Sequence, residues 1–195
     1  MSVDERVLRA VRTWGHTPER ERAVAAFSHL GEHAAVWLAI GLAGGAIDTS
    51  RRERWGRATA TVAATYALNT AIKLAVRRRR PELKGLPPLT GTPTQLSFPS
   101  AHASTSFAGA LVYSRLGLPA PPLYALAAGL AVSRLYLGVH HPSDVLAGAL
   151  LGTGVAIARG SGAQAGPSPN GSGPIASSSN GHGPMRPARA AGGAL

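Results

Sequence analysis

The 195-residue sequence contains no cysteine. Disulfide bonds, thiolate metal sites and cysteine nucleophiles are therefore excluded. Aromatic residues make up only 5% of the chain, and nine acidic residues stand against 20 Lys and Arg, which gives a formal net charge of +11. The first residues lack the continuous apolar core of a cleavable signal peptide, so we expect no such peptide. The length leaves room for a single domain.

The positive charge has two explanations. A nucleic-acid-binding domain spreads Lys and Arg over a soluble surface, often together with aromatic residues that stack on bases. In this chain the Arg residues stand between apolar runs, as they do in membrane proteins whose charges lie in the loops. The distribution favours a membrane protein and argues against a nucleic-acid partner.

Five apolar stretches follow one another through the middle of the chain. None is strongly hydrophobic, but each approaches the roughly 17 residues that a helix needs to cross a bilayer. The stretches are 31–47, 58–76, 101–118, 122–139 and 142–158. Their many small residues would allow helices to approach closely in lipid. We predict an all-α, integral-membrane bundle of about five transmembrane helices; soluble buried helices of the same length are the alternative.

Two flanking segments differ from this predicted membrane domain, which spans 29–158. In residues 1–28, apolar residues such as Val3 and Val7 recur at helical spacing. This pattern predicts an amphipathic helix that either lies in the membrane interface or packs on the rest of the protein. Residues 159–195 are rich in Gly, Ser, Pro and Ala and have few apolar side chains to bury, so we predict a disordered tail.

Polar residues concentrate at the ends of the apolar stretches. A charged side chain at the centre of a membrane helix costs about 2.5–3.5 kcal/mol on insertion scales, so its presence needs a reason. If successive helices alternate in direction, three groups of polar residues meet at one end of the bundle. These groups are Lys73 with Arg80, Ser100 with His102, and Arg134 with His140 and Asp144.

This combination of residue types suits phosphoryl transfer. Guanidinium and ammonium groups match the oxygens of a phosphate, and the start of a helix adds backbone donors for an oxyanion. One His can attack phosphorus while a second protonates the departing oxygen. An Asp beside the attacking His holds its tautomer and stabilises the positive charge that develops. The chemistry requires no metal, and we expect no cofactor.

Three motifs carry a resemblance to a known family. Residues 73–81 follow the pattern K-x6-R-P, residues 99–102 read P-S-A-H, and residues 133–144 follow S-R-x5-H-x3-D. In this order and spacing they resemble the signature of the type-2 phosphatidic acid phosphatase (PAP2) superfamily, and the match covers about residues 30–157. The one departure is Ala101, where the family pattern has Gly. Its methyl group fits if the backbone is helical there.

The resemblance implies a role for each matching residue. The phosphate would be bound by Lys73, Arg80, Ser100, the amide of Ala101, and Arg134. His102 would be the general acid. His140, supported by Asp144, would form a phosphohistidine that water then hydrolyses.

The resemblance also implies a metal-independent lipid phosphatase that crosses the plasma membrane several times. In size and single-domain organisation the chain is most similar to actinobacterial members that dephosphorylate a polyprenyl-linked phosphoribose, such as decaprenylphosphoryl phosphoribose. Undecaprenyl pyrophosphate, phosphatidic acid and phosphatidylglycerol phosphate stay open as substrates. A non-catalytic membrane protein that binds lipid phosphate is a further alternative, and a soluble acid phosphatase or haloperoxidase-like enzyme is disfavoured by the apolar stretches.

Residues beside the motifs receive other interpretations. Of four consecutive arginines only Arg80 has the family's spacing, so 77–79 are predicted to contact lipid headgroups. The pair His140 and His141 is not expected to bind a metal, because adjacent side chains diverge and the arginines would repel a cation. Asn69 is expected to form a hydrogen bond across helices.

Overall fold

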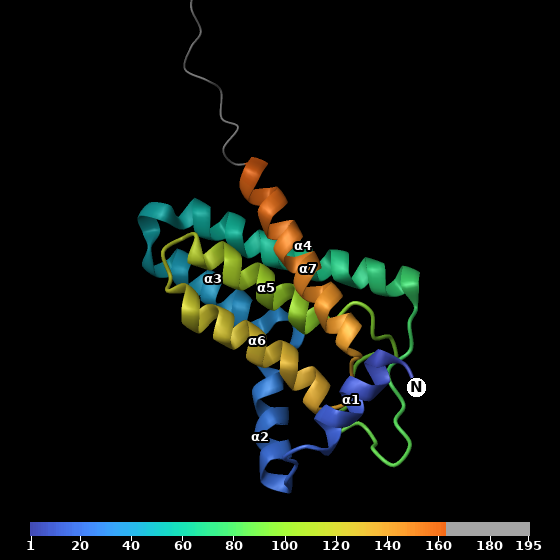
Figure 1. Ribbon diagram of the computed structural model, residues 1–195. Helices are drawn as coiled ribbons and strands as arrows, with labels where there is room; N and C mark the ends of the chain where they lie inside the picture. The colour runs from blue at the N-terminus through green and yellow to red at the C-terminus, as the bar shows by residue number, and fades with distance from the viewer. Residues whose placement is uncertain (163–195) are drawn as a thin grey trace, which may run out of the picture. The chain divides into compact units, whose positions relative to one another are not determined.

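Seven α-helices make up the part of the chain that the computed structural model describes, residues 1–162 (Figure 1). They are α1 Val3–Thr13, α2 Pro18–His29, α3 Ala35–Ile47, α4 Arg52–Val76, α5 Ala101–Ser114, α6 Ala120–Tyr136 and α7 Pro142–Gly162. Two short 3-10 turns, η1 Glu32–Ala34 and η2 Thr49–Arg51, precede α3 and α4. No strand occurs in these residues, so the predicted all-α class is confirmed.

Helix α5 lies at the centre of the bundle and packs against α4, α6 and α7 (Figure 1). Its many Ala, Ser and Gly residues present small side chains, and most of the helix is buried. Larger residues pack around it: Nε1 of Trp37 donates to Ser106 Oγ at 2.9 Å, and Tyr113 OH donates to the Trp37 carbonyl at 2.8 Å. Both packing and buried hydrogen bonds therefore fix the central helix.

The contact between α5 and α7 is a close approach of the two backbones. A Cβ atom placed on Gly152 would lie 1.9 Å from the carbonyl oxygen of Ser104, and one placed on Gly148 would lie 2.5 Å from that of Ser100. Only glycine fits at these two positions of α7. The approach also allows the Ser100 amide to donate to the carbonyl of Asp144 at 3.0 Å, which links the starts of both helices.

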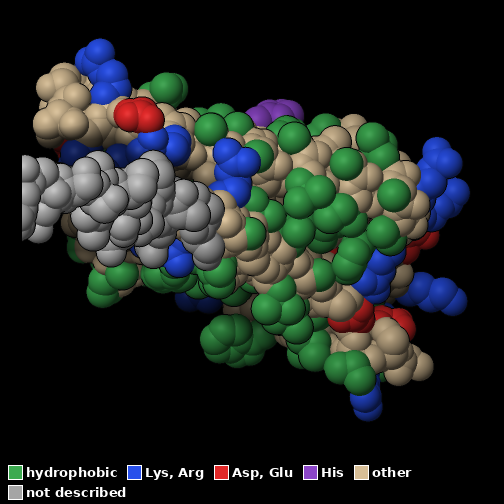
Figure 2. All heavy atoms as spheres, turned by 90° about the horizontal axis from the view of Figure 1, so that it is seen from above, with side chains coloured by type: hydrophobic (Ala, Val, Ile, Leu, Met, Phe, Trp, Pro, Cys, Tyr) green, Lys and Arg blue, Asp and Glu red, His purple; other side chains and the backbone are tan. Residues whose placement is uncertain are grey.

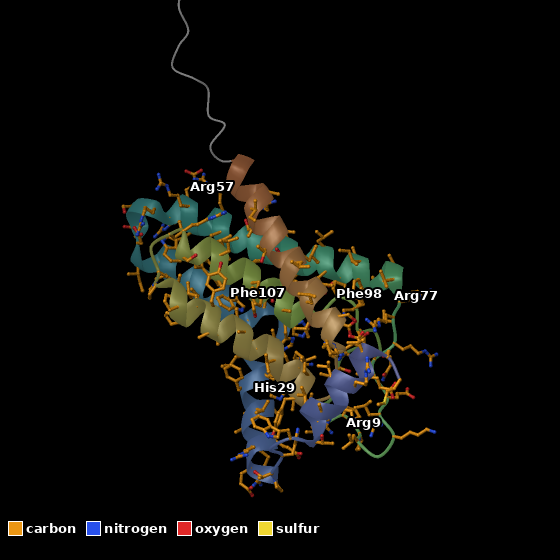
Figure 3. The ribbon with its side chains drawn as sticks, viewed as in Figure 1. Arg9, His29, Arg57, Arg77, Phe98 and Phe107 are labelled. Atoms are coloured by element: carbon orange, nitrogen blue, oxygen red, sulfur yellow. The ribbon has the colours of Figure 1, made fainter. Side chains whose placement is uncertain are left out.

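The helix ends that carry the predicted motifs meet at one end of the bundle. Helix α4 ends where Arg77 adopts a left-handed backbone with φ of 55°. The loop that follows returns the chain to Ser100, the N-cap of α5. Figure 3 shows Arg77 and the loop residue Phe98 on the same side of the bundle. The alternating helix directions expected from the sequence are therefore present.

The predicted apolar stretch 58–76 is the C-terminal part of a longer helix. Helix α4 begins at Arg52, because Asp48 caps the preceding turn by accepting from the Arg51 amide at 3.2 Å. Nε1 of Trp55, in the first turn of α4, also donates to Asp48 at 3.2 Å. These polar contacts extend the helix beyond the apolar residues.

The other predicted boundaries also shift. Helix α5 ends at Ser114, before the predicted end of the stretch 101–118. Helix α7 continues through Gly162, so residues 159–162 of the predicted tail are helical. The rest of that tail lies outside the described residues.

The predicted amphipathic helix within 1–28 is two helices rather than one. The chain turns at Gly15, whose φ is +67°, and Thr17 then caps α2 by accepting from the Arg20 amide. Leu8 is completely buried, so α1 packs one face on the rest of the protein. Trp14, just after α1, is 83% exposed.

The helices do not individually satisfy the length and composition expected of a membrane span. Within residues 1–162, no single helix is both long and apolar enough to cross a bilayer. One bent pair, Pro18–His29 with Glu32–Ile47, meets both requirements together, with a bend of 46° between its halves.

The close α5–α7 contact predicts a difference between two glycine-to-alanine variants. Gly152→Ala should lower the free energy of unfolding by roughly 1–3 kcal/mol, the usual cost of overpacking. Gly154 has no atom within 4 Å of its Cβ position, so Gly154→Ala should be neutral or stabilising through helix propensity. The measurement is the midpoint of thermal unfolding of the two detergent-purified variants. Equal midpoints for Gly152→Ala and Gly154→Ala would contradict the close contact between α5 and α7.

Candidate active site

The predicted site residues converge on one cavity of about 160 Å³ at the motif-bearing end of the bundle. Its wall includes Lys73, Arg80, Ala101, His102, Arg134 and His140. Its remaining lining is Glu32, His33, Tyr66, Asn69, Thr70, Pro93 and Thr94. Two predicted site residues, Ser100 and Asp144, are completely buried and lie behind this wall. Three cations thus face a space with the dimensions of a small anion.

His140 is held between a cation and a carboxylate. Its Nε2 atom lies 3.3 Å from Nη1 of Arg80, and its Nδ1 atom lies 3.5 Å from Oδ2 of Asp144. Because a guanidinium can only donate, Nε2 must be the nitrogen that carries the lone pair. The ring proton is then on Nδ1, on the side of Asp144, and this is the tautomer that attack by Nε2 requires.

Asp144 is fixed by donors other than His140. Its Oδ1 accepts from Nη1 of Arg78 at 2.8 Å, and its Oδ2 accepts from the backbone amide of His141 at 2.8 Å. The carboxylate also lies in the first turn of α7, where the helix dipole favours negative charge. Arg78 was predicted to contact a lipid headgroup, and that prediction is wrong, because its guanidinium binds Asp144.

Ser28, near the end of α2, holds two of the predicted site residues. Its hydroxyl accepts from Nη1 of Arg134 at 2.6 Å, and its carbonyl accepts from Nε2 of His102 at 3.0 Å. The bond to a carbonyl places a proton on Nε2 of His102, so Nδ1 is the ring nitrogen left for a substrate. No motif surrounds Ser28 in the sequence, and its role follows only from the packing of α2.

Lys73 and Arg80 donate to backbone carbonyls of the loop before α5 and of the segment after α6. Nζ of Lys73 donates to the Leu96 carbonyl at 3.2 Å, and Arg80 donates to the carbonyls of Thr94 at 2.8 Å and Val139 at 2.6 Å. Burial lowers the pKa of Arg80 to about 10, which leaves it charged at neutral pH. Neutral carbonyl acceptors orient these cations without cancelling their charge.

Several buried polar atoms at the site have no hydrogen-bond partner in the described part of the chain. They include Nε of Arg134, Oγ of Ser100 and Nδ1 of His140. A buried donor without a partner is costly, and phosphate oxygens would accept from the guanidinium and the hydroxyl. In residues 1–162, no group of three or more His, Asp or Glu side chains is arranged to hold a metal ion.

Two further predictions concern the backbone and a neighbouring side chain. Ala101 is the first residue of α5 and does not have a positive φ, so the methyl group in place of the family's Gly is accommodated. Asn69 Nδ2 donates to the Pro99 carbonyl at 3.3 Å. This partner lies in the loop before α5 and not in a helix, so the structure shows a bond from helix to loop where a bond across helices was expected.

A helical bundle that gathers three cations, two histidines and a buried aspartate around an anion-sized cavity belongs to the class of phosphate-ester enzymes. The model of the PAP2 superfamily matches residues 54–161 of this chain. The chain belongs to the PAP2 superfamily and is one of its phosphatases, as the motifs predicted.

Sequence relatives include two mycobacterial enzymes. The chain is 44% identical over 124 residues to a decaprenylphosphoryl-5-phosphoribose phosphatase of Mycolicibacterium smegmatis, covering 63% of this chain and 68% of the relative. It is 44% identical over 129 residues to the protein of the same name from Mycobacterium tuberculosis, and this match covers 66% of this chain and 72% of the relative.

Solved structures share the fold. Aquifex aeolicus LpxE superimposes with a TM-score of 0.71 at 24% identity, covering 83% of this chain and 96% of that one. A transmembrane PAP2-type phosphatidylglycerolphosphate phosphatase from Bacillus subtilis superimposes with a TM-score of 0.66 at 22% identity, covering 82% of this chain and 84% of that one. A bacterial vanadium-dependent iodoperoxidase gives 0.65 at 18% identity, with coverage of 81% and 48%. The fold thus occurs both in a phosphatase and in a peroxidase.

The surroundings of His140 predict a pH-dependent stability. Burial lowers the pKa of His140 to about 3, and the neighbouring Arg80 acts in the same direction while Asp144 opposes it. Between that value and the pKa of about 6.5 in an unfolded chain, the unfolded state binds more protons at this residue. The contribution of His140 to the free energy of unfolding is therefore fully present above about pH 6.5. This contribution is lost as the pH is lowered below that value.

His140→Gln removes the titrating group while keeping a polar side chain. The fall in thermal midpoint between about pH 7.5 and pH 5 should therefore be smaller in this variant than in the unmodified protein. The same fall in both proteins would mean that His140 is not held neutral by the fold.

Proposed function

We propose that the protein hydrolyses a phosphomonoester on a membrane lipid through a phosphohistidine formed at His140, without a metal ion. The observation that carries the proposal is the order of contacts from Arg80 to His140 to Asp144. This order leaves a lone pair on Nε2 at a cavity lined by cations and places the ring proton beside a carboxylate. Binding alone needs neither feature, which disfavours a non-catalytic lipid-phosphate-binding protein.

The reaction begins when the phosphate oxygens bind Lys73, Arg80 and Arg134, with Ser100 and the Ala101 amide as further donors. The guanidinium of Arg80 then shifts from Nε2 of His140 to a phosphate oxygen, which frees the lone pair for attack on phosphorus. The bound phosphate anion favours a second proton on the His102 ring, at Nδ1, while Nε2–H stays bonded to the Ser28 carbonyl. The P–O bond to the lipid alcohol breaks, and the Nδ1 proton of His102 passes to the departing oxygen, which leaves the ring neutral.

The second half of the reaction releases phosphate. While the P–N bond exists, Asp144 stabilises the positive charge of the His140 ring. Water then attacks phosphorus, with His102 taking its proton, and the bond between phosphorus and Nε2 breaks. Inorganic phosphate leaves, and Arg80 can return to Nε2.

The favoured substrate is a polyprenyl-linked phosphoribose, as in the names of the mycobacterial relatives. The mouth of the cavity supports a sugar beside the phosphate. Glu32 lines the same cavity as the three cations, where its charge weakens the binding of a bare phosphate but can accept hydrogen bonds from hydroxyls.

The backbone at this mouth is strained. His33 and Ala34 both have left-handed backbones, with φ of 50° and 61°. Such residues cost of order 1–3 kcal/mol each and cluster at functional sites. Nδ1 of His33 lies 2.9 Å from the hydroxyl of Tyr66, so the strained turn also places polar groups at the entrance. These groups suit the hydroxyls of a ribose.

We further propose that residues 29–158 form a membrane-embedded phosphatase domain that crosses the plasma membrane several times, with the helices of 1–28 at its interface. Figure 2 shows apolar side chains over the middle of one face, with Lys and Arg mainly toward its two ends. Arg57 and Arg77 lie toward opposite ends of α4 in Figure 3. Large apolar side chains exposed on the bundle include Leu42, Leu68, Leu74, Leu146 and Leu150. The likeness to a transmembrane phosphatase agrees with this placement.

Replacing the nucleophile should abolish phosphate release. His140→Ala in the detergent-purified protein is expected to lose more than about a thousandfold of kcat, as removal of a covalent nucleophile usually does. His141→Ala is the matched control and should remain active, because His141 contacts Asp144 through its backbone amide and carbonyl, which the substitution keeps. Phosphate release is measured from a panel of lipid phosphates with a chelator present. Full activity of His140→Ala would remove the proposed nucleophile.

Glu32 predicts a change in substrate preference. Glu32→Gln should lower kcat/KM roughly tenfold for a polyprenyl-linked phosphoribose, because an acceptor for a hydroxyl is weakened. For a polyprenyl phosphate without a sugar, kcat/KM should stay equal or rise, because a repulsive charge is gone. Glu53→Gln, in the first turn of α4 and outside the cavity wall, controls for the loss of one negative charge. Equal effects on both lipids would argue against recognition of the sugar by Glu32.

A further inference from the structure

Arg78 connects the site to the N-terminal helix. Its Nη1 atom donates to Oδ1 of Asp144 at 2.8 Å, and its Nη2 atom donates to Oδ2 of Asp4 at 2.9 Å. One guanidinium thus joins the carboxylate behind the proposed nucleophile to a carboxylate of α1. Charge-assisted hydrogen bonds of this kind are strong and directional.

Asp4 is itself bound to the start of α7. Its Oδ1 accepts from the Ser143 amide at 3.0 Å, and its Oδ2 accepts from the Ser143 hydroxyl. The same hydroxyl accepts from Nη1 of Arg78 at 2.7 Å. Ser143 directly precedes Asp144, so Asp4 and Arg78 together fix the first turn of α7.

The rest of α1 fixes the position of Asp4. Ser2 caps the helix by accepting from the Glu5 amide at 3.1 Å, and Leu8 is completely buried. At the other end, Arg12 donates to the Pro87 carbonyl at 2.6 Å. Helix α1 is therefore held at both ends, and its first turn cannot move without breaking contacts to α7 and to the loop after α4.

This network lies partly outside the residues that define the family. The family model matches 54–161, which includes Arg78 and Asp144 but not Asp4. The predicted motif assigns Arg80 alone to the site. Nothing in the motif requires an arginine at position 78 or a helix before residue 54.

We infer that Arg78 and Asp4 are positioning residues for the His140–Asp144 pair, and that α1 supports catalysis by holding Asp4 in place. Arg78 holds Oδ1 of Asp144, so that Oδ2 stays beside Nδ1 of His140. Asp4 shares the single charge of Arg78, which prevents the guanidinium from fully neutralising Asp144. The inference rests on the proposed nucleophilic role of His140.

The test measures kcat and KM for phosphate release by the full-length protein in detergent, with a polyprenyl-linked phosphoribose as substrate. Arg78→Gln should lower kcat roughly 10- to 100-fold while KM stays within about twofold, because Arg78 is not part of the cavity wall. Arg78→Lys, which keeps the charge but not the fork, should recover part of this loss. The matched control is Arg79→Gln, an exposed neighbour, which should behave as the unmodified protein.

Asp4 is tested in the same assay. Asp4→Asn should lower kcat by a smaller factor, roughly 3- to 10-fold, and Glu5→Gln is its control. Because Asp4 acts through Arg78, the double variant should be no slower than Arg78→Gln alone, whereas independent roles would multiply the two losses. If Arg78→Gln does not fold, Arg78→Lys and Asp4→Asn test the inference. A lower kcat in both variants at an unchanged thermal midpoint would support the positioning roles, and an unchanged kcat would overturn them.

The outcomes separate this inference from the proposed function. An inactive His140→Ala together with unmodified kcat in Arg78→Gln and Asp4→Asn would overturn the positioning roles and leave the phosphohistidine mechanism intact. An active His140→Ala would overturn both. A loss in Arg78→Gln that appears in KM rather than kcat would make Arg78 a substrate-binding residue and would also overturn the inference.

Discussion

The structure depends on keeping three cations close together around a cavity that holds no fixed opposing charge of equal size. The three cations, Lys73, Arg80 and Arg134, repel one another. Among the described residues 1–162, Asp144 is the only completely buried carboxylate beside them. The fold compensates with neutral acceptors, because each cation donates to a backbone carbonyl or a hydroxyl. These acceptors orient the cations and leave their net charge available to an anion.

The acceptors come from segments far apart in the sequence, so packing must bring them together with small tolerance. The glycines of α7 allow its backbone to touch that of α5, which joins the amide of Ser100 to the carbonyl of Asp144. Helix α2 contributes Ser28, and the loop after α4 contributes the carbonyls of Thr94 and Leu96. A displacement of α2 or of the loop after α4 would separate a cation from its acceptor.

The sequence predicted the helical class, the helices that carry the motifs and six of the thirteen residues that line the cavity, because spacing and apolar patterns are local signals. It did not predict the roles of Ser28, Arg78 or Asp4, whose partners lie 65 to 139 residues away. Such contacts depend on how helices pack, and a run of four arginines gives no indication of which side chain turns inward. The break between α1 and α2 was also missed, because a glycine at φ of +67° interrupts a pattern that is otherwise helical.

The contact between Arg80 and Nε2 of His140 has a consequence for chemical selectivity. If His140 is the nucleophile, as proposed, the Arg80 guanidinium covers its reactive lone pair in the resting protein, and an electrophile that does not displace Arg80 cannot reach it. Only a ligand that competes for Arg80 uncovers the nitrogen. A doubly charged terminal phosphate competes far better than the singly charged diester that joins a sugar to a lipid chain. On this mechanism the resting site is inhibited by its own arginine, and a lipid that carries both linkages would be cleaved at the terminal phosphomonoester and not at the internal diester.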